Sequence, residues 1–293
     1  MSVILRIGIL FFSLLALFAR ADAPLLWNQK AVAANCPSTP DQQWVEYANG
    51  QACMRYFSAG DLQNAPVVVV VFSGDRETFI KRAPQNIPAN TATAQRKQAQ
   101  KLARKTTLPV VIVARPGTYG SSGNHYRRRQ PEEFNALNAT LDSLRARYHM
   151  QQFILTGHSG GATAASALLT LGRRDIRCAI LTSGAWDLLN RAEALRRVRG
   201  EKSDANKDVT GLAAPYDPLY HLDGIPADPQ RLIVVIGNLL DSNTPFELQV
   251  KFARALREKG HRVMLVESPA YPPEYHNLQG NPGIRYVNRC AKQ

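Results

Sequence analysis

Short runs of consecutive apolar residues, many of them β-branched, recur along this chain at intervals long enough to hold a helix. Unbroken runs of this kind are typical of strands that are buried on both faces of a sheet. When such strands alternate with helices, they form a mostly parallel sheet with helices on both faces. The sequence therefore predicts an α/β fold. The predicted parallel strands are 66–72, 108–114, 153–156, 178–182, 231–237 and 262–266.

Two further strands, 43–47 and 52–57, flank Asn49-Gly50, a dipeptide typical of a tight hairpin turn. They bring the predicted sheet to about eight strands, with an antiparallel hairpin at its N-terminal end. Segment 187–230 is mixed and charged, and we expect loops, short helices and a small cap or insertion there. Because the composition does not break along the chain, 22–293 is predicted to form one domain. Helices are predicted at 89–104, from near Pro131 to about Tyr148, after Gly161 to about Leu171, and at 245–258.

The first 21 residues have the pattern of a secretory signal peptide. The stretch from Val3 to Ala19 is long and apolar, with Arg6 as its one charge, and two small-x-small cleavage patterns follow, at 19–21 and 21–23. We expect cleavage after Ala21 and a periplasmic or secreted protein. The alternative is an uncleaved anchor, although a membrane-spanning helix needs about 20 apolar residues.

The four cysteines suit an exported protein, because an even number can form two disulfides. Three pairings exist, and the favoured one joins Cys36 to Cys53 and Cys178 to Cys290. The sequence has no Cys-x-x-Cys motif or His/Cys spacing typical of zinc ligands. We therefore expect neither a metal nor a cofactor.

The segment 157–161, Gly-His-Ser-Gly-Gly, matches the pattern G-x-S-x-G between a predicted strand and a predicted helix. In that setting the serine sits on a tight turn with an exposed hydroxyl, and the glycines let the strand and the helix approach closely. Ser159 is therefore the candidate nucleophile. The alternative interpretation of the pattern is a simple glycine-rich turn.

A serine nucleophile needs a histidine base, and the histidine needs a carboxylate that orients it. On this architecture the acid and the base follow the serine, each after a later strand. His276 is the histidine that follows the last predicted strand, and Asp241 follows the strand before it. Asp241 could instead cap the next helix, and Glu267 is the weaker candidate for the acid.

Stabilisation of an oxyanion needs two N–H donors near the serine. The residue after the nucleophile, Gly160, supplies the first donor, because a helix begins there. The second donor is expected in the loop after strand 66–72, where Asp75 N–H is the first choice and Gly74 N–H the next.

Three motifs carry a resemblance over about residues 43–290: Arg-Pro-Gly-Thr-Tyr-Gly-Ser-Ser at 115–122, the turn around Ser159, and 241–245 followed by His276. With them, the sequence resembles an α/β-hydrolase fold serine hydrolase. Its last third, with Tyr-Asp-Pro at 216–218, is similar to the catalytic domain of the prolyl oligopeptidase family. The resemblance implies a triad of Ser159, Asp241 and His276. It does not imply peptidase activity, because residues 24–65 cannot supply that family's β-propeller.

The net charge of +13 becomes +11 when residues 1–21, with Arg6 and Arg20, are removed. The basic clusters 101–105, 127–129 and 196–199 are scattered over several predicted elements, without an interleaved aromatic stripe. This pattern argues against nucleic-acid binding and favours weak contact with anionic surfaces. Cluster 127–129 follows a loop on the side of the candidate site, which is compatible with acidic substrates.

The main hypothesis is therefore an exported serine hydrolase that cleaves a carboxylic ester, carried by a small molecule, through an acyl-enzyme. The second hypothesis keeps this chemistry with a peptide or amide substrate. The third is a non-catalytic binding protein on a hydrolase scaffold, which would be expected to show a broken triad. The sequence does not indicate an oligomeric state.

Overall fold

The computed structural model describes residues 22–292 of the 293-residue chain. The predicted signal peptide, 1–21, lies outside the described residues. Within 22–292, no helix combines the length and the apolar character that crossing a membrane requires.

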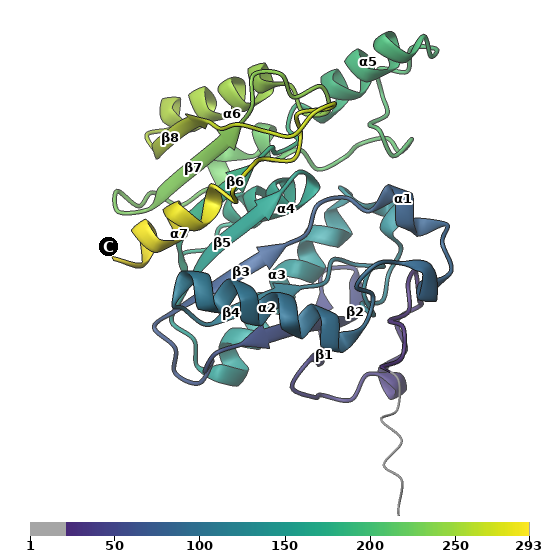
Figure 1. The fold of residues 1–293 in the computed structure, drawn as a ribbon, viewed down its shortest axis with the longest axis vertical. Coiled ribbons are helices and arrows are strands. Elements are labelled where there is room, and N and C mark those ends of the chain that lie inside the picture. The colour runs from purple at the N-terminus through teal and green to yellow at the C-terminus, as the bar shows by residue number, and fades with distance from the viewer. Residues whose placement is uncertain (1–21, 293) are drawn as a thin grey trace, which may run out of the picture.

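Eight strands form one sheet in the order β1-β2-β4-β3-β5-β6-β7-β8 (Figure 1). The β1–β2 and β2–β4 pairs are antiparallel, and the remaining neighbours are parallel. The predicted mostly parallel sheet and N-terminal hairpin are confirmed. The strands are β1 (Gln42–Tyr47), β2 (Gly50–Ala59), β3 (Val67–Phe72), β4 (Val110–Val113), β5 (Gln152–His158), β6 (Ile176–Thr182), β7 (Leu232–Gly237) and β8 (Arg262–Glu267).

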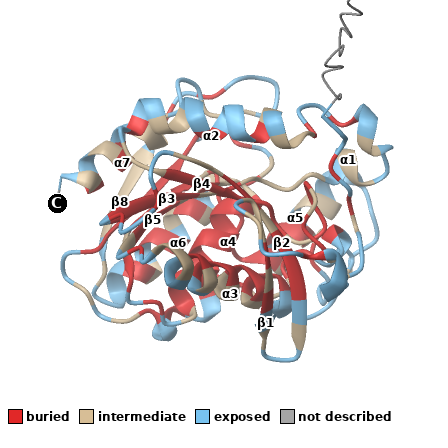
Figure 2. Ribbon diagram, turned by 90° about the horizontal axis from the view of Figure 1, so that it is seen from below, coloured by how far each residue is buried: buried red, intermediate tan, exposed pale blue. Residues whose placement is uncertain are grey.

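The side chains of the central strands alternate between two apolar cores, one on each face of the sheet. Val68 and Val70 of β3 belong to the first core, whereas Val67 and Val69 belong to the second. Helices α3, α4 and α6 cover the first face, and α2 and α7 cover the second (Figure 2). Burial on both faces explains why these strands are continuous apolar runs. The helices are α1 (Glu77–Ile80), α2 (Ala92–Thr106), α3 (Pro131–Tyr148), α4 (Gly160–Thr170), α5 (Leu188–Arg199), α6 (Phe246–Glu258) and α7 (Gly283–Ala291).

Helix α7 is a difference from the sequence prediction, which placed no helix after the last strand. It begins next to Pro282 and buries Tyr286, Val287 and Cys290 against the sheet. Its glycine start and β-branched residues have low intrinsic helix propensity, so tertiary packing has to stabilise it. Segment 187–230 holds the twelve-residue helix α5, followed mainly by irregular chain and two single 3₁₀ turns.

Both disulfides of the favoured pairing are present. Cys36–Cys53 joins the N-terminal segment to β2 and closes a sequence separation of 17 residues. Cys178–Cys290 joins β6 to α7 across a separation of 112 residues. The second disulfide therefore fastens the last helix to a central strand of the sheet.

Strand β5 lies in the middle of the sheet, between β3 and β6. Gly157 of β5 is paired with Phe72 of β3 and with Leu181 of β6. Because these strands are parallel, their carboxyl ends meet at one edge of the sheet, and the loops that follow β3, β5, β6, β7 and β8 meet there too. Every residue predicted for the site lies in one of these loops or at the start of the helix after β5.

Candidate active site

Ser159 occupies a tight turn between β5 and α4. Its φ is 56° and its ψ is −126°, a strained conformation for a residue that carries a side chain. The glycines of the motif are required sterically. A Cβ at Gly157 would lie 2.1 Å from the carbonyl oxygen of Gly161, and one at Gly161 would lie 2.2 Å from that of Phe72. The turn thus needs both glycines to bring the helix onto the sheet.

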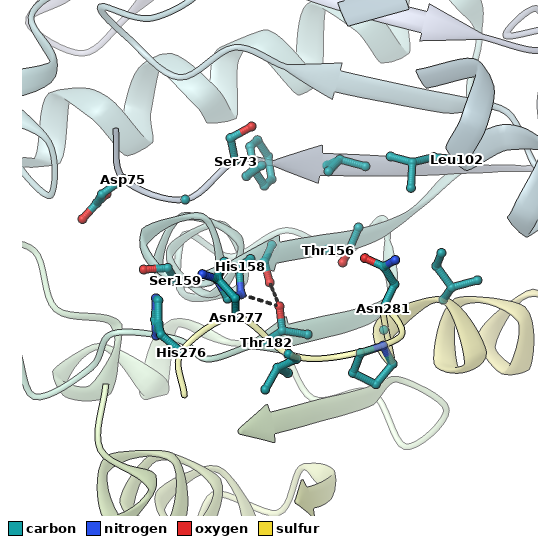
Figure 3. Close-up of a pocket in the computed structure, with 18 of the residues that line it drawn as sticks. Ser73, Asp75, Leu102, Thr156, His158, Ser159, Thr182, His276, Asn277 and Asn281 are labelled. Atoms are coloured by element: carbon teal, nitrogen blue, oxygen red, sulfur yellow. Dashed lines mark hydrogen bonds between the residues drawn. The ribbon is translucent and has the colours of Figure 1, made fainter. Parts of the chain in front are cut away.

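The turn is also tied to the neighbouring strand. Ser159 N–H donates to the Thr182 carbonyl of β6 at 2.9 Å, and Ala162 N–H donates to the Ser159 carbonyl at 2.9 Å. Ser159 lines a cavity of about 560 Å³, and so does His276 from the loop between β8 and α7. Figure 3 shows the two residues as neighbours at one end of this cavity.

Asp241, in the loop between β7 and α6, contacts the base candidate directly. Its Oδ2 accepts from His276 Nδ1 at 2.9 Å. Its Oδ1 accepts from the N–H groups of Asn243 and Thr244 at 2.9 and 2.8 Å. A buried carboxylate with this number of donors is well satisfied and fixed in orientation. The fallback acid, Glu267, is exposed at the end of β8.

Two hydroxyl side chains that the sequence reasoning missed support this pair. Thr244 Oγ1 lies 2.9 Å from Asp241 Oδ2 and 3.1 Å from the Ser183 carbonyl. Ser183 Oγ donates to the His276 carbonyl at 3.0 Å. Thr244 and Ser183 are fully buried. Ser183 directly follows β6, at the edge of the sheet where the carboxyl ends of the strands meet. This position was the sequence feature that could have indicated a role for Ser183 in the site.

His158 directly precedes Ser159 in the chain, and its side chain lies against the site. Its ring centroid is 4.8 Å from that of His276, and its Nδ1 is 3.3 Å from Thr182 Oγ1. Burial, and then the neighbouring His276, lower the pKa of His158 to about 4. The His158 ring is therefore neutral at neutral pH and packs beside the base candidate.

The two expected oxyanion donors come from neighbouring segments, since a Cβ on Gly160 would lie 2.0 Å from Asp75 Oδ1. Gly160 is the first residue of α4, where backbone N–H groups lack partners within the helix. The loop after β3 approaches closely, since a Cβ on Gly74 would lie 3.3 Å from Ser159 Cβ. In the described part of the chain, no hydrogen bond engages the N–H of Asp75 or of Gly160. Both groups could therefore donate to an oxyanion.

The side chain of Asp75 has a separate role in a buried cluster of arginines. It pairs with Arg115 at 2.8 Å, with Arg128 at 3.3 Å and closely with Arg129. Burial alone would raise the pKa of Asp75, but the positive charges of Arg129, Arg115 and Arg128 outweigh it and hold the pKa well below its ordinary value. Two members of the basic cluster 127–129 are thus internal, and Arg127 is the exposed one.

The rest of the cavity extends along the sheet toward α2 and α7. This part of the cavity is lined by Leu102 of α2, Val287 of α7, and Val69 and Val71 of β3. In Figure 3, Ser73 and Asp75 lie on the same side of the cavity as Ser159 and His276, and Leu102 lies on the opposite side. Within residues 22–292, no three His, Cys, Asp or Glu side chains are placed to share a metal ion.

Residues 110–287 match the sequence model of the prolyl oligopeptidase family. A comparison with curated proteins gave no match. Among solved structures, the Pyrococcus furiosus esterase Pf2001 superposes with a TM-score of 0.59 and 13% identity, over 92% of this chain and 98% of that one. Est1E from Butyrivibrio proteoclasticus superposes with a TM-score of 0.56 and 11% identity, over 86% of this chain and 98% of that one.

The acylaminoacyl peptidase of Pyrococcus horikoshii superposes with a TM-score of 0.52 and 17% identity, over 88% of this chain and 41% of that one. A second acylaminoacyl peptidase is covered to 39%. The chain therefore spans about two fifths of these peptidases and nearly all of the esterases. These similarities establish that the chain has the α/β-hydrolase fold.

Proposed function

Since the chain belongs to the prolyl oligopeptidase family and is a serine hydrolase, we propose that it cleaves carboxylic esters through an acyl-enzyme on Ser159. In this scheme Ser159 Oγ attacks the ester carbonyl and His276 Nε2 takes the hydroxyl proton. The C–O bond to the alcohol then breaks, and His276 returns the proton to the departing alcohol. Water, deprotonated by His276, releases the acid and restores Ser159.

The observation that carries this proposal is the 2.9 Å contact between Asp241 Oδ2 and His276 Nδ1, in a cavity that Ser159 also lines. With Nδ1 engaged by a carboxylate, Nε2 is the nitrogen left for proton transfer. The N–H groups of Asp75 and Gly160 are proposed to stabilise the oxyanion, because they lie beside Ser159 and carry no other hydrogen bond in the described chain.

An ester is the first candidate substrate because the esterases Pf2001 and Est1E superpose on this chain with TM-scores of 0.59 and 0.56, against 0.51 and 0.52 for the two acylaminoacyl peptidases. A peptide or amide substrate is the second candidate, which the family membership favours.

We further propose an exported protein of one domain, 22–293, whose segment 187–230 forms part of the cavity wall. Two disulfides support an oxidising compartment. Arg191 of α5 is the residue of that segment that lines the cavity. N-terminal sequencing of the exported protein tests the processing, and a mature chain that still begins at Met1 would contradict it.

A fluorophosphonate probe tests the nucleophile. The mature protein should be labelled at Ser159 and the Ser159→Ala variant should not, while the exposed Ser203→Ala control keeps the label. Wild-type protein that resists the probe would overturn the proposal. Turnover of 4-nitrophenyl butyrate compared with prolyl and aminoacyl anilides then decides the substrate, and comparable kcat/KM on an anilide would favour the peptidase.

A further inference from the structure

Arg191 is a buried arginine in the wall of the cavity that holds Ser159 and His276. It lies on α5, and its relative exposure is 6%. Within residues 22–292 it forms no ion pair. A buried arginine is normally paired with a carboxylate, because desolvation of an uncompensated charge is costly.

The contacts of Arg191 are with neutral groups. Its Nε donates to the Asn243 carbonyl at 2.8 Å, and its Nη2 donates closely to Asn243 Oδ1. Its Nη1 is buried and has no hydrogen-bond partner in the described chain. The Arg191 guanidinium therefore has a free N–H donor group at Nη1 and a positive charge that no carboxylate neutralises among the described residues.

The nearby carboxylates are occupied by other cations. Asp75 is shared by three arginines, Glu77 pairs with Arg128 at 2.8 Å, and Asp208 pairs with Arg129 at 3.4 Å. Asp241 is in contact with His276. No acidic side chain of the cluster is therefore left to neutralise Arg191.

The electrostatic surroundings of Arg191 agree with this geometry. Burial, and then the positive charge of Arg129, lower the pKa of Arg191 to about 10. The group remains charged at neutral pH, but the protein stabilises its charged form less than water does. An anion bound beside it would supply the missing compensation.

A second arginine lines the same cavity. Arg76 follows the oxyanion candidate Asp75, is half-buried, and has an Nε without a hydrogen-bond partner among the described residues. It too forms no ion pair within 22–292. The cavity wall near Ser159 therefore carries two guanidinium groups without carboxylate partners.

We propose that Arg191, together with Arg76, binds a carboxylate on the substrate, so that this enzyme prefers anionic esters to neutral ones. A guanidinium presents donors that match a carboxylate and, once desolvated, holds it strongly. The inference rests on the proposed esterase function. The competing role for Arg191 is purely structural, as the tie that holds Asn243 and the loop of Asp241.

The experiment uses two pairs of rigid substrates that differ only in one para substituent. The carboxylate is on the leaving group in 4-acetoxybenzoate and on the acyl group in the 4-nitrophenyl ester of terephthalic acid. The matched neutral esters carry a carboxamide in its place. We expect kcat/KM to favour the carboxylate in at least one pair, and the pair that responds identifies which side of the substrate carries the anion.

The Arg191→Met variant should lose about 10- to 100-fold of the ratio of anionic to neutral kcat/KM. Arg191→Lys, which keeps the charge, should restore part of the ratio. Arg197→Met is the matched control, because Arg197 is exposed on the same helix, away from the cavity. Equal losses on anionic and neutral esters in Arg191→Met would mean the structural role and would overturn the proposal.

Equilibrium binding separates this inference from the esterase chemistry. Calorimetric titration of the Ser159→Ala protein with both substrate pairs should show tighter binding of the carboxylate than of the carboxamide in at least one pair, and this result does not require turnover. The same titration tests the proposal if the Arg191 variants fail to fold. Equal binding of carboxylate and carboxamide in both pairs, with wild-type protein still labelled by fluorophosphonate, would reject the anion site and leave the proposed function standing.

Discussion

Asp241 accepts the Nδ1 hydrogen of His276 at 2.9 Å, and the same carboxylate receives two backbone N–H groups and lies within hydrogen-bond distance of the Thr244 hydroxyl. These contacts leave the carboxylate little freedom to turn away from the imidazole. They also tie the orientation of His276 to the loop 238–245, in which Asn243 is the residue that lines the cavity. Catalytic efficiency should therefore depend on residues that do not touch the ester.

Thr244 provides the most direct test of this dependence. Thr244→Val removes the hydroxyl 2.9 Å from Asp241 Oδ2 while it keeps the shape and the backbone donor. A hydrogen bond to a charged group contributes about 1.5–3 kcal/mol, so kcat should fall about tenfold or more. Thr244→Ser should recover most of the activity. Steady-state kinetics with a 4-nitrophenyl ester measures this, and an unchanged kcat in Thr244→Val would contradict the role.

Asp75 should matter for stability through its side chain. Asp75→Asn leaves the buried Arg115, Arg128 and Arg129 without their shared carboxylate. Removal of one partner from a buried charge cluster costs about 3–5 kcal/mol. Urea unfolding should show that loss. The control Asp223→Asn, whose side chain is 85% exposed, should stay within about 0.5 kcal/mol of wild type; equal stability of the two variants would contradict the prediction.

The close packing of the turn around Ser159 predicts that a glycine-to-alanine substitution there destabilises the protein more than one elsewhere. Gly161→Ala places a Cβ 2.2 Å from the Phe72 carbonyl oxygen, so the free energy of unfolding should fall by about 3 kcal/mol. In Gly283→Ala, the nearest atom would be Ile180 Cγ2 at 3.3 Å, and we expect little change. Thermal unfolding compares the two, and a Gly161→Ala protein as stable as Gly283→Ala would show that the turn can relax.

The two disulfides should differ in their contribution to stability. In the chain-entropy model a loop of about 15 residues contributes about 3 kcal/mol and one of about 100 residues about 4.7 kcal/mol. The separations here are 17 and 112 residues. The double variant at Cys178 and Cys290 should therefore unfold at a lower temperature than the one at Cys36 and Cys53. It should also lose more activity, because Gly283 and Val287 of α7 line the cavity. The reverse order of unfolding temperatures would argue against the model.

The lowered pKa of His158 predicts that the free energy of unfolding depends on pH. Its pKa is about 4 in the folded protein and 6.5 in the ordinary case, so the fold binds fewer protons than the unfolded chain between these values. Its contribution is present above pH 6.5 and is lost as the pH falls toward 4, by on the order of 3 kcal/mol. His158→Gln should flatten this part of the curve.

Chemical unfolding at several pH values between 4 and 7 measures this effect as the difference between wild type and His158→Gln. Asp217 acts in the opposite sense, because burial raises its pKa to about 6 and its contribution is lost as the pH rises through that value. Its effect is common to both proteins and cancels in the difference. Parallel curves for the two proteins would contradict the assignment to His158.

The strands and the nucleophile turn could be predicted because their signals are local. Burial on both faces produces continuous apolar runs, and the turn at Ser159 needs glycines at fixed spacing. Helix α7 could not be predicted in this way, since its stability comes from contacts with the sheet and from the Cys178–Cys290 disulfide.

The residues that support the site could not be predicted either, because they too depend on contacts between segments that are distant in sequence. Ser183 and Thr244 are ordinary polar residues in sequence, and only the meeting of the loops after β6 and β7 brings them to His276 and Asp241. Likewise, a run of three arginines at 127–129 reads as a solvated patch, although two of them are buried around Asp75. Arg191 lies in segment 187–230, where the sequence shows no regular spacing of apolar residues from which its position could have been predicted.

Strand β5 is held on both edges, by β3 and by β6, whereas a part of the cavity wall comes from α2, α5 and α7 at the periphery of the sheet. The proposed nucleophile follows a central strand of the sheet, whereas residues that can contact the rest of a substrate lie on the surrounding helices. Under the proposed function, sequence changes in the outer helices would alter which acyl or alcohol groups are accepted, while the Ser159 hydroxyl keeps its place. The same scaffold is therefore open to new substrates without rebuilding its chemistry.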